Sequence, residues 1–370
     1  MATVPPSLIE ITSRHQLHLE GVKTGIARKF DPFLIQMSKD IERRLLKVDI
    51  TEYNARRLEK LKALVEEDMQ DSYGKYYDIW REQIIDLSNY ESVFEVRSLE
   101  QVIETHDFAL PSRTQLRAAV FGKPFVSLTG PGKGLLLETF YQNWTVKGIN
   151  SVAGEITNGF YQGKTTPQIV RAIKGTGALK WQDGILSKEI NRELTSVVRT
   201  AVQHAAMEAR NETWNVNSDI ITGWVFVATI DKRTSAECAS FDGQVFPLNE
   251  GPFPPLHVQC RSTTAAQIDE RFSILESTAT RSTRNEKGVV EKDVSAKKTF
   301  YEILKTRSQA YQDEFLGVNR AKLFRDGGIS AKRFSELNYD KLLYKERTLA
   351  EMRELEPLAF EKAGVTYGEN

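Results

Sequence analysis

The chain has 370 residues, 40% of them hydrophobic and 27% charged, and its 50 Lys and Arg balance 50 Asp and Glu. This composition is typical of a folded globular protein, and it excludes a disordered or fibrous chain and a molecule attracted as a whole to nucleic acid or membrane. Because the first residues lack an export signal and no run approaches about 18 apolar residues, we expect the protein to remain in the cytoplasm where it is made.

The N-terminal region, residues 1–110, is expected to be helical. Apolar residues recur at helical spacing over residues 34–47 and 52–87, and a third apolar segment covers residues 93–103. Aromatic residues at helical spacing more often form a core or a partner interface than a platform for nucleic-acid bases. We expect this of one group in the second helix: Tyr73, Tyr76, Tyr77 and Trp80.

Residues 111–134 are expected to form a connecting loop or hairpin, because residues 121–134 are rich in turn residues. The segment GPGKG at 130–134 invites comparison with a phosphate-binding loop. The pattern fails, however, because Ser127 stands where the first Gly is required and Gly134 replaces the Ser or Thr that binds magnesium. A tight turn is the favoured interpretation.

The next part of the chain is expected to change from helices to strands. Helices are predicted over residues 135–163, from Thr166 onward and from Ser187 onward. After Gly223 the apolar period falls from 3.6 residues to two, which indicates short strands. We predict strands at residues 224–230, 243–246 and 261–268, with a short helix at 236–241 and a proline-rich loop before the last strand.

The chain as a whole is predicted to be an α+β protein. A mainly helical N-terminal half leads into a small α+β core, residues 135–275, with a short mixed or antiparallel sheet and flanking helices. Residues 276–295 are polar and without periodicity, so we expect a linker or long loop there. Residues 296–370 are expected to be the C-terminal helical part of the core, with helices near 296–315 and 348–362.

The run from Trp224 to Thr264 resembles the signature of the phage Mu F-like minor head proteins. The matching positions are Thr229, Asp231, Arg233, Thr234, Cys238, Phe241, Asp242, Gly243, Pro254, Pro255, His257, Cys260 and Arg261. Residues 197–212 are similar to the helix that precedes the strand in that family. Residues 300–330 are similar to a later helix, through Gln312, Gly317, Arg320 and Gly327. The resemblance covers about residues 135–355.

This resemblance implies a minor capsid protein that acts in head morphogenesis of a tailed bacteriophage by binding and not by catalysis. The expected partners are the portal protein, other head proteins, viral double-stranded DNA and other copies of the chain. No membrane partner is expected in the assembled head. The protein would be made in the host cytoplasm and lie in the virion, inside the head or at the portal vertex, with a role in DNA packaging or ejection.

Cys238, His257 and Cys260 are the candidate metal ligands, because they are the only clustered soft ligands in the chain. Asp242 or Asp231 could complete the four ligands of a structural zinc. Richer versions of the family pattern carry additional Cys residues at two positions where this chain has Ser235 and Ser262. The alternative is that no metal binds, and that His257 and the cysteines hold the loop by packing and hydrogen bonds.

The remaining matched residues are expected to have structural roles. Asp231 and Arg233 could form a local ion pair, and Asp242 and Gly243 suit a tight turn. The loop with prolines at 247, 252, 254 and 255 should return to a strand beside residues 243–246, and its end needs a clamp. We therefore expect Cys238, His257 and Cys260 to converge with or without metal.

Parts of the sequence also suggest two functions other than a phage head protein. The first is an ADP-ribosyltransferase-like enzyme or toxin on a related fold, in which Arg261 and residues 262–264 would be the Arg and Ser-Thr elements of the site. The reaction also needs a Glu that stabilises the transition state. The nearest candidates, Glu354 and Glu356, are two residues apart in a helical segment, so their side chains point in different directions. A nucleic-acid-binding module would use residues 281–345, which carry 15 Lys and Arg against 9 Asp and Glu. Such a modest basic tract is usually only a solvated surface.

Overall fold

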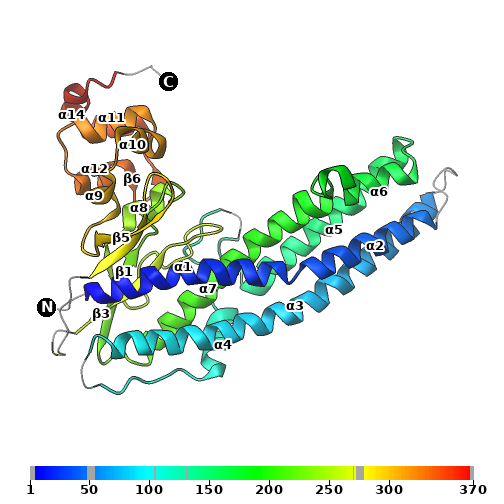
Figure 1. Cartoon of the computed structure of the whole chain (residues 1–370), viewed down its shortest axis with the longest axis horizontal. Coiled ribbons are helices and arrows are strands. Elements are labelled where there is room, and N and C mark those ends of the chain that lie inside the picture. Colours follow the sequence, from blue (N-terminus) through cyan, green and yellow to red (C-terminus); the bar gives the residue numbers. More distant parts are fainter. Residues whose placement is uncertain are drawn as a thin grey trace.

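Figure 1 shows the computed structural model, in which a long helical arm joins a small sheet and a separate group of C-terminal helices. The structure describes residues 5–47, 55–103, 106–130, 132–269, 271 and 279–366. The predicted α+β class is confirmed. None of the described helices is both long and apolar enough to span a membrane.

Three helices form the N-terminal part of the arm: α1 (Pro6–Arg28), α2 (Asp31–Leu46) and α3 (Ala55–Glu100). The prediction of two separate segments at 52–87 and 93–103 was wrong, because α3 is one helix of 46 residues. Its apolar stripe is interrupted by the buried polar residues Ser88, Glu91 and Ser92. For the same reason the periodicity did not reveal α1, whose buried face includes His15 and Lys23.

Residues 111–134 contain more structure than a connecting loop. Helix α4 (Arg113–Gly122) begins with a capping box between Ser112 and Gln115, so the prediction of a loop was wrong there. The residues after α4 agree with the predicted hairpin and tight turn. The Phe125 amide donates to the Leu135 carbonyl at 2.9 Å, and the Gly134 amide donates to the Phe125 carbonyl at 3.0 Å.

The helices predicted between residues 135 and 215 are present and complete the arm. They are α5 (Leu137–Tyr161), α6 (Thr166–Lys174), the short helices η1 (Gly177–Leu179) and η2 (Leu186–Asn191), and α7 (Arg192–Asn215). Helix α7 is the structural centre of the protein, because it packs against α1, α3, α4 and α5 and also contacts the sheet.

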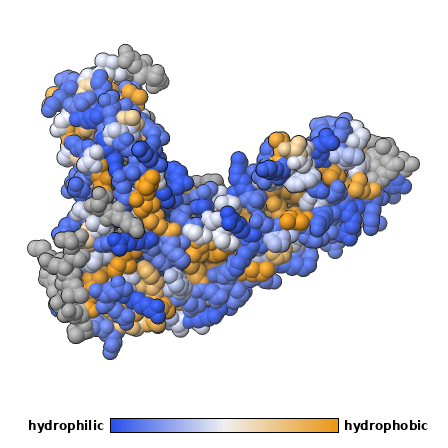
Figure 2. Space-filling model, in the orientation of Figure 1, coloured by the Kyte–Doolittle hydropathy of each residue, from blue (hydrophilic) through white to orange (hydrophobic). Residues whose placement is uncertain are grey.

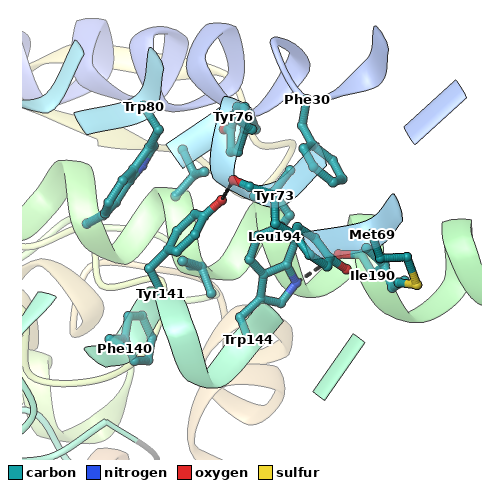
Figure 3. Packing of buried hydrophobic residues seen from close by; sticks show 14 of the residues in the cluster. Phe30, Met69, Tyr73, Tyr76, Trp80, Phe140, Tyr141, Trp144, Ile190 and Leu194 are labelled. Carbon is teal, nitrogen blue, oxygen red and sulfur yellow. Dashed lines mark hydrogen bonds between the residues drawn. The ribbon is translucent and has the colours of Figure 1, made fainter. Parts of the chain in front are cut away.

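The aromatic group of α3 lies in the core of the arm, as Figure 3 shows. Tyr73, Tyr76 and Trp80 are buried, and the Tyr141 hydroxyl donates to the Tyr73 carbonyl at 2.9 Å. Trp144 donates to the Ile190 carbonyl at 3.2 Å. These contacts hold α3, α5 and η2 together.

The sheet is antiparallel and has the order β2-β1-β3: β1 (Ile221–Val227), β2 (Val245–Pro247) and β3 (Thr263–Ile268). Trp224 of β1 stands opposite Phe246 on one side and Ala266 on the other. The central strand therefore has a neighbour at each edge, and the burial of successive residues from Gly223 to Val227 means that both of its faces are covered, as its apolar sequence predicts. Helix α8 (Ala236–Phe241) follows β1. The expectation that the proline-rich loop connects adjacent strands was wrong, because β1 lies between β2 and β3.

Most of the predicted linker, residues 276–295, is instead a β-hairpin formed by β4 (Thr280–Arg284) and β5 (Val290–Ser295), while residues 276–278 lie outside the described residues. The hairpin packs on α1, where the Thr280 amide donates to Glu10 at 3.0 Å. The prediction failed because the buried residues of β4, Arg281 and Thr283, are polar and give no hydrophobic period.

The C-terminal helices are α9 (Phe300–Leu304), α10 (Gln309–Leu316), α11 (Val318–Asp326), α12 (Ala331–Asn338), α13 (Leu349–Leu355) and α14 (Pro357–Ala363). A small hairpin of β6 (Tyr339–Asp340) and β7 (Lys345–Glu346) follows α12. The helix predicted near 296–315 is divided in two, because Ser308 caps a new helix.

The hydrophobic core has three parts: one in the arm, one around the sheet and one among the C-terminal helices. The core of the arm joins residues before 110 to residues after 135, for example Phe30 to Trp144. The predicted division of the chain at residues 110, 134, 275 and 295 stays a prediction.

Candidate metal centre

Cys238 is placed by the turn that follows β1. The Thr234 hydroxyl donates to the Thr229 carbonyl, and the Thr229 hydroxyl donates to the Arg261 carbonyl at 2.6 Å. Ser235 then caps α8, where its hydroxyl accepts from the Cys238 amide at 3.1 Å. This turn places the buried Cys238 side chain close to the loop that carries His257 and Cys260.

His257 and Cys260 are brought together by a tight turn. The peptide bond between Pro254 and Pro255 is cis, and Leu256 is fully buried. The Cys260 amide donates to the His257 carbonyl at 3.0 Å, while Gln259 adopts the left-handed conformation with φ of 62°. Both side chains therefore point to the same side of the loop.

The three predicted ligands converge, and their distances are close to those of a zinc site. Their ligand atoms all lie within 4.8 Å of one another. The two sulfurs are 3.8 Å apart, and the Cys238 sulfur is 3.3 Å from His257 Nε2. Tetrahedral bonds of about 2.3 Å to sulfur and about 2.0 Å to nitrogen would separate two sulfurs by about 3.8 Å and a sulfur from a nitrogen by about 3.5 Å.

The orientation of His257 also suits a metal ligand. Its Nδ1 is 3.0 Å from the Val258 carbonyl and can donate a hydrogen bond to it. This bond keeps a proton on Nδ1, so the nitrogen that would lose its proton to bind a metal is Nε2, which faces the Cys238 sulfur. Histidines that bind metals in proteins are usually held by such a hydrogen bond from the second ring nitrogen.

The cluster also favours one ionised thiol. Burial would lower the pKa of His257, but hydrogen bonding and charge interaction with Cys260 raise it to about 9. Burial opposes ionisation of Cys260 too, yet hydrogen bonds with Cys238 and His257 bring the pKa of that thiol well below its ordinary value. Burial raises the pKa of Cys238. Cys260 is therefore the thiolate of the group, and thiolate is the form that binds zinc.

Asp242 and Asp231, predicted as possible fourth ligands, are not in the cluster, because arginines engage both carboxylates. Asp242 pairs with Arg281 at 2.9 Å and accepts from the amides of Ala228 and Phe300. The fourth ligand of a zinc ion here would be water or a hydroxyl. Interactions with the Ser235 and Ser262 hydroxyls partly offset the effect of burial on the pKa of Cys238, which places both hydroxyls beside this thiol.

The predicted ion pair between Asp231 and Arg233 is present, but Asp231 has a closer partner. Its carboxylate accepts from Arg261 at 2.7 Å, and both side chains are largely buried. Arg233, the predicted partner, is 3.8 Å away and 72% exposed at its side chain, so it adds little. Gly243 does form the predicted turn, with φ of 78°, and a Cβ there would lie 2.9 Å from Thr299.

Three residues of the surroundings were not predicted from the sequence. Arg281 lies in the segment predicted to be a linker, and only the fold shows that it neutralises Asp242. Glu237 is buried beside the cluster, and burial raises its pKa. Lys23 of α1 is fully buried and donates to the Cys260 carbonyl at 3.4 Å. The polar stretch around Arg281 and the isolated lysine gave no recognisable signal.

Helix α7 anchors the loop to the arm. Thr200 accepts from the Gln259 amide at 3.0 Å, and Gln203 donates to the Ser262 carbonyl at 2.7 Å. Two turns further on, Arg210 donates to Thr263 at 2.6 Å and pairs with Glu95 of α3 at 2.9 Å. The cluster therefore lies where the sheet, α8 and the helical arm meet.

The residues proposed for ADP-ribosyl transfer are occupied in structural contacts. Arg261 pairs with Asp231, while Thr263 is buried and accepts a hydrogen bond from Arg210. Glu356 follows the last residue of α13 and pairs with Arg333. The described structure gives this alternative no support.

One comparison with known proteins gives a match. Residues 150–265 match the family model described as Phage Mu protein F like protein. The matched part extends from within α5 into β3 and includes Cys238, His257 and Cys260.

No curated protein and no solved structure matches the chain significantly. The family match ends before residues 300–330, so the similarity noted there stays a prediction. Over residues 150–265 the chain is therefore similar to the phage Mu F-like protein family.

Proposed function

We propose that the protein is a minor head protein of a tailed bacteriophage, which binds the portal during head assembly and genome packaging or delivery. The observation that carries this proposal is the family match over residues 150–265, because that family suggests a role in phage head morphogenesis. The protein acts as a binding component and not as an enzyme. Its place is in the virion, at or near the portal vertex.

The N-terminal helices supply the portal-binding surface in this proposal. Helix α3 exposes two large side chains, Ile79 and Tyr90, in a long helix that otherwise buries most of its apolar residues. Exposed apolar side chains of this kind are common anchors of protein interfaces. The outward face of α3 is therefore the surface to test first.

The experiment is coexpression of the full chain with the portal protein of the same phage, followed by affinity purification of the portal. The wild type should copurify. Replacing Ile79 and Tyr90 by Ser should weaken copurification, whereas the control Tyr161→Ser, an exposed aromatic on α5, should not. If the variant binds portal fully, the surface is wrongly assigned. If the wild type does not bind portal at all, the portal-binding function itself is wrong.

We also propose that Cys238, His257 and Cys260 hold a structural zinc. The distances between their ligand atoms, the orientation of His257 and the thiolate character of Cys260 support this proposal. Zinc would connect α8 to the loop before β3, which also contacts α1 and α7. Its role would be to stabilise the fold, because structural zinc contributes directly to folding energy.

A further inference from the structure

Glu237 is a buried carboxylate of α8, one residue before the candidate ligand Cys238. Charged side chains generally stay at a protein surface, and Figure 2 shows a face of this molecule that is largely covered by hydrophilic residues. Burying an ionised carboxylate is unfavourable unless a cation or hydrogen bonds compensate for the lost water. Five carboxylates of the described part of the chain are nevertheless buried: Glu91, Glu95, Asp231, Glu237 and Asp242.

Glu237 differs from the other four buried carboxylates, because each of those pairs with a basic side chain. The pairs are Glu91 with His15, Glu95 with Arg210, Asp231 with Arg261, and Asp242 with Arg281. Glu237 forms no ion pair with any residue that the structure describes. A carboxylate in this position needs a strong hydrogen-bond donor in place of a basic side chain.

The contacts of Glu237 leave one of its oxygens without a donor. Oε2 lies 3.5 Å from the Thr129 hydroxyl. The Tyr339 hydroxyl interacts with the same carboxyl group, but Oε1 is buried and has no hydrogen-bond partner of normal geometry among the described residues. Buried polar atoms nearly always have a partner, so Oε1 marks the place of a missing donor.

Thr129 holds this carboxylate beside the candidate metal ligands. The Thr129 hydroxyl donates to the Leu256 carbonyl at 2.9 Å, and Leu256 directly precedes His257. The carboxyl group also interacts electrostatically with His257 and Cys260. It is therefore anchored between Cys238, its neighbour in sequence, and the loop that carries the other two ligands.

One water molecule can supply both the donor that Oε1 lacks and the ligand that the metal lacks. A tetrahedral zinc bound by Cys238, His257 and Cys260 keeps a fourth position for a further ligand. The carboxylate oxygens are not among the ligand atoms that lie within 4.8 Å of one another, so a water has to span the remaining distance. A water bound to zinc is polarised and becomes a strong donor to a carboxylate.

We propose that Glu237 completes the metal centre by accepting a hydrogen bond, at Oε1, from the water that fills the fourth position of the zinc ion. Glu237 is then a positioning residue, which reaches the metal only through this water. Groups of this kind orient the ligands of metal sites and raise metal affinity. This inference rests on the proposed zinc site, and it adds a residue that the spacing of the cysteines and the histidine does not reveal.

The test compares the zinc affinities of the wild type and Glu237→Gln, measured by competition with a chromophoric chelator. The amide keeps the size of the side chain but is a weaker acceptor, so the variant should bind zinc about 10- to 100-fold more weakly. Ser262→Ala is the matched control, because it removes a buried hydroxyl beside Cys238 and leaves the carboxylate in place. It should bind zinc like the wild type.

Two further measurements separate positioning of the metal ligand from a role in the fold alone. In metal-free protein, Glu237→Gln should melt at or above the wild-type temperature, because the substitution removes a buried carboxylate that has no cation. Zinc should then raise the melting temperature of the wild type more than that of the variant. With cobalt(II) in place of zinc, the visible absorption bands, which report ligand geometry, should shift in Glu237→Gln and stay unchanged in Ser262→Ala.

Each outcome decides between the zinc site and this inference. If Glu237→Gln binds zinc as tightly as the wild type and gives the same cobalt spectrum, the inference is wrong while the zinc site stands. If zinc raises the melting temperatures of both proteins equally, Glu237 supports only the fold, and the inference is also wrong. A loss of affinity in Ser262→Ala alone would give the fourth position to the serine hydroxyl. A wild type that binds neither zinc nor cobalt would overturn the zinc site and this inference together.

Discussion

Individual side chains around the metal centre are held by buried ion pairs whose partners are distant in sequence. Arg281 neutralises Asp242 from the β4–β5 hairpin, and Arg261 neutralises Asp231 across the turn after β1. Breaking such a pair leaves an uncompensated buried charge, which costs more than the pair itself contributes. These arginines therefore fix the position of the turn and of α8.

Acid should remove the contribution of the Asp231 carboxylate to the free energy of unfolding. Burial would raise the pKa of this carboxyl, but hydrogen bonds and charge from Arg261 outweigh it and lower the pKa below its ordinary value. A carboxyl with a lowered folded-state pKa stabilises the protein above its unfolded pKa of about 3.9, and this stability is lost as pH falls through the folded pKa. Asp231→Asn should therefore flatten the loss of stability in urea below about pH 4.

The same variant should be less stable at neutral pH by about 3 kcal/mol, because Arg261 remains buried without its carboxylate. The matched control is Arg233→Ala, which removes an exposed partner 3.8 Å away and should change stability by less than about 0.5 kcal/mol. If the two substitutions lower the free energy of unfolding equally, the pair with Arg261 is not the main stabilising contact of Asp231.

Zinc content tests the metal centre directly. Elemental analysis should find about one zinc per chain, and chelation should lower the melting temperature, since structural zinc contributes to folding. Cys260→Ser should lose the metal. Gln259→Gly, between the two loop ligands, should keep it and should also relieve a positive φ. If the purified protein contains no metal and chelation does not change its melting temperature, the loop is held by packing and hydrogen bonds alone.

At the scale of elements, close packing of α5 depends on one glycine. A Cβ at Gly148 would lie 2.4 Å from the Tyr73 hydroxyl and 3.3 Å from Ile190. Gly148→Ala should therefore destabilise the arm by about 1–3 kcal/mol. Gly154, on the same helix, has nothing within 4 Å of that position, so Gly154→Ala should stabilise by about 0.5–1 kcal/mol. If both substitutions change the melting temperature in the same direction, this account of the packing is wrong.

The sequence predicted those elements whose buried faces are apolar. The strand around Trp224 and the helices after residue 135 followed from hydrophobic period, and the convergence of Cys238, His257 and Cys260 followed from their spacing. Elements with polar buried faces were missed, notably α1 and the β4–β5 hairpin. Their buried polar groups find partners only in the fold, as His15 does with Glu91 at 2.7 Å.

The partners in the candidate site follow the same rule. Asp242 was recognisable as part of a motif, but its partner Arg281 is 39 residues away in a segment without a pattern. The carboxylate was therefore assigned to the metal when it belongs to an ion pair. Local spacing predicts which residues share a turn, whereas a long-range charge pair requires the tertiary structure.

At the scale of the whole molecule, the N-terminal helices are part of the core and not a detachable docking arm. Lys23 and Gln203 link α1 to α7 at 2.7 Å, and α1 also supports the β4–β5 hairpin. Removing α1 to α3 would expose the aromatic core of Figure 3 to water. Binding surfaces on these helices are therefore better tested by substitution of exposed residues than by deletion.

DNA contact should be weak in this account. Several cations of residues 281–345 are already paired, including Arg281 with Asp242, Arg307 with Glu291 and Arg325 with Asp313. These pairs reduce the number of cations that can bind phosphates. Binding of duplex DNA, measured by fluorescence anisotropy, should be detectable at about 50 mM salt and largely lost by about 200 mM, as counterion release requires. Tight binding that persists at the higher salt would contradict this expectation.

The proposed incorporation of the protein into a phage head through the portal can be tested by quantitative mass spectrometry of purified particles. We expect the protein to be present in DNA-filled heads at far lower abundance than the major capsid protein. We also expect heads assembled without portal to lack it. If the protein is expressed in infected cells but absent from purified virions, or if it is incorporated equally with and without portal, the proposal is wrong.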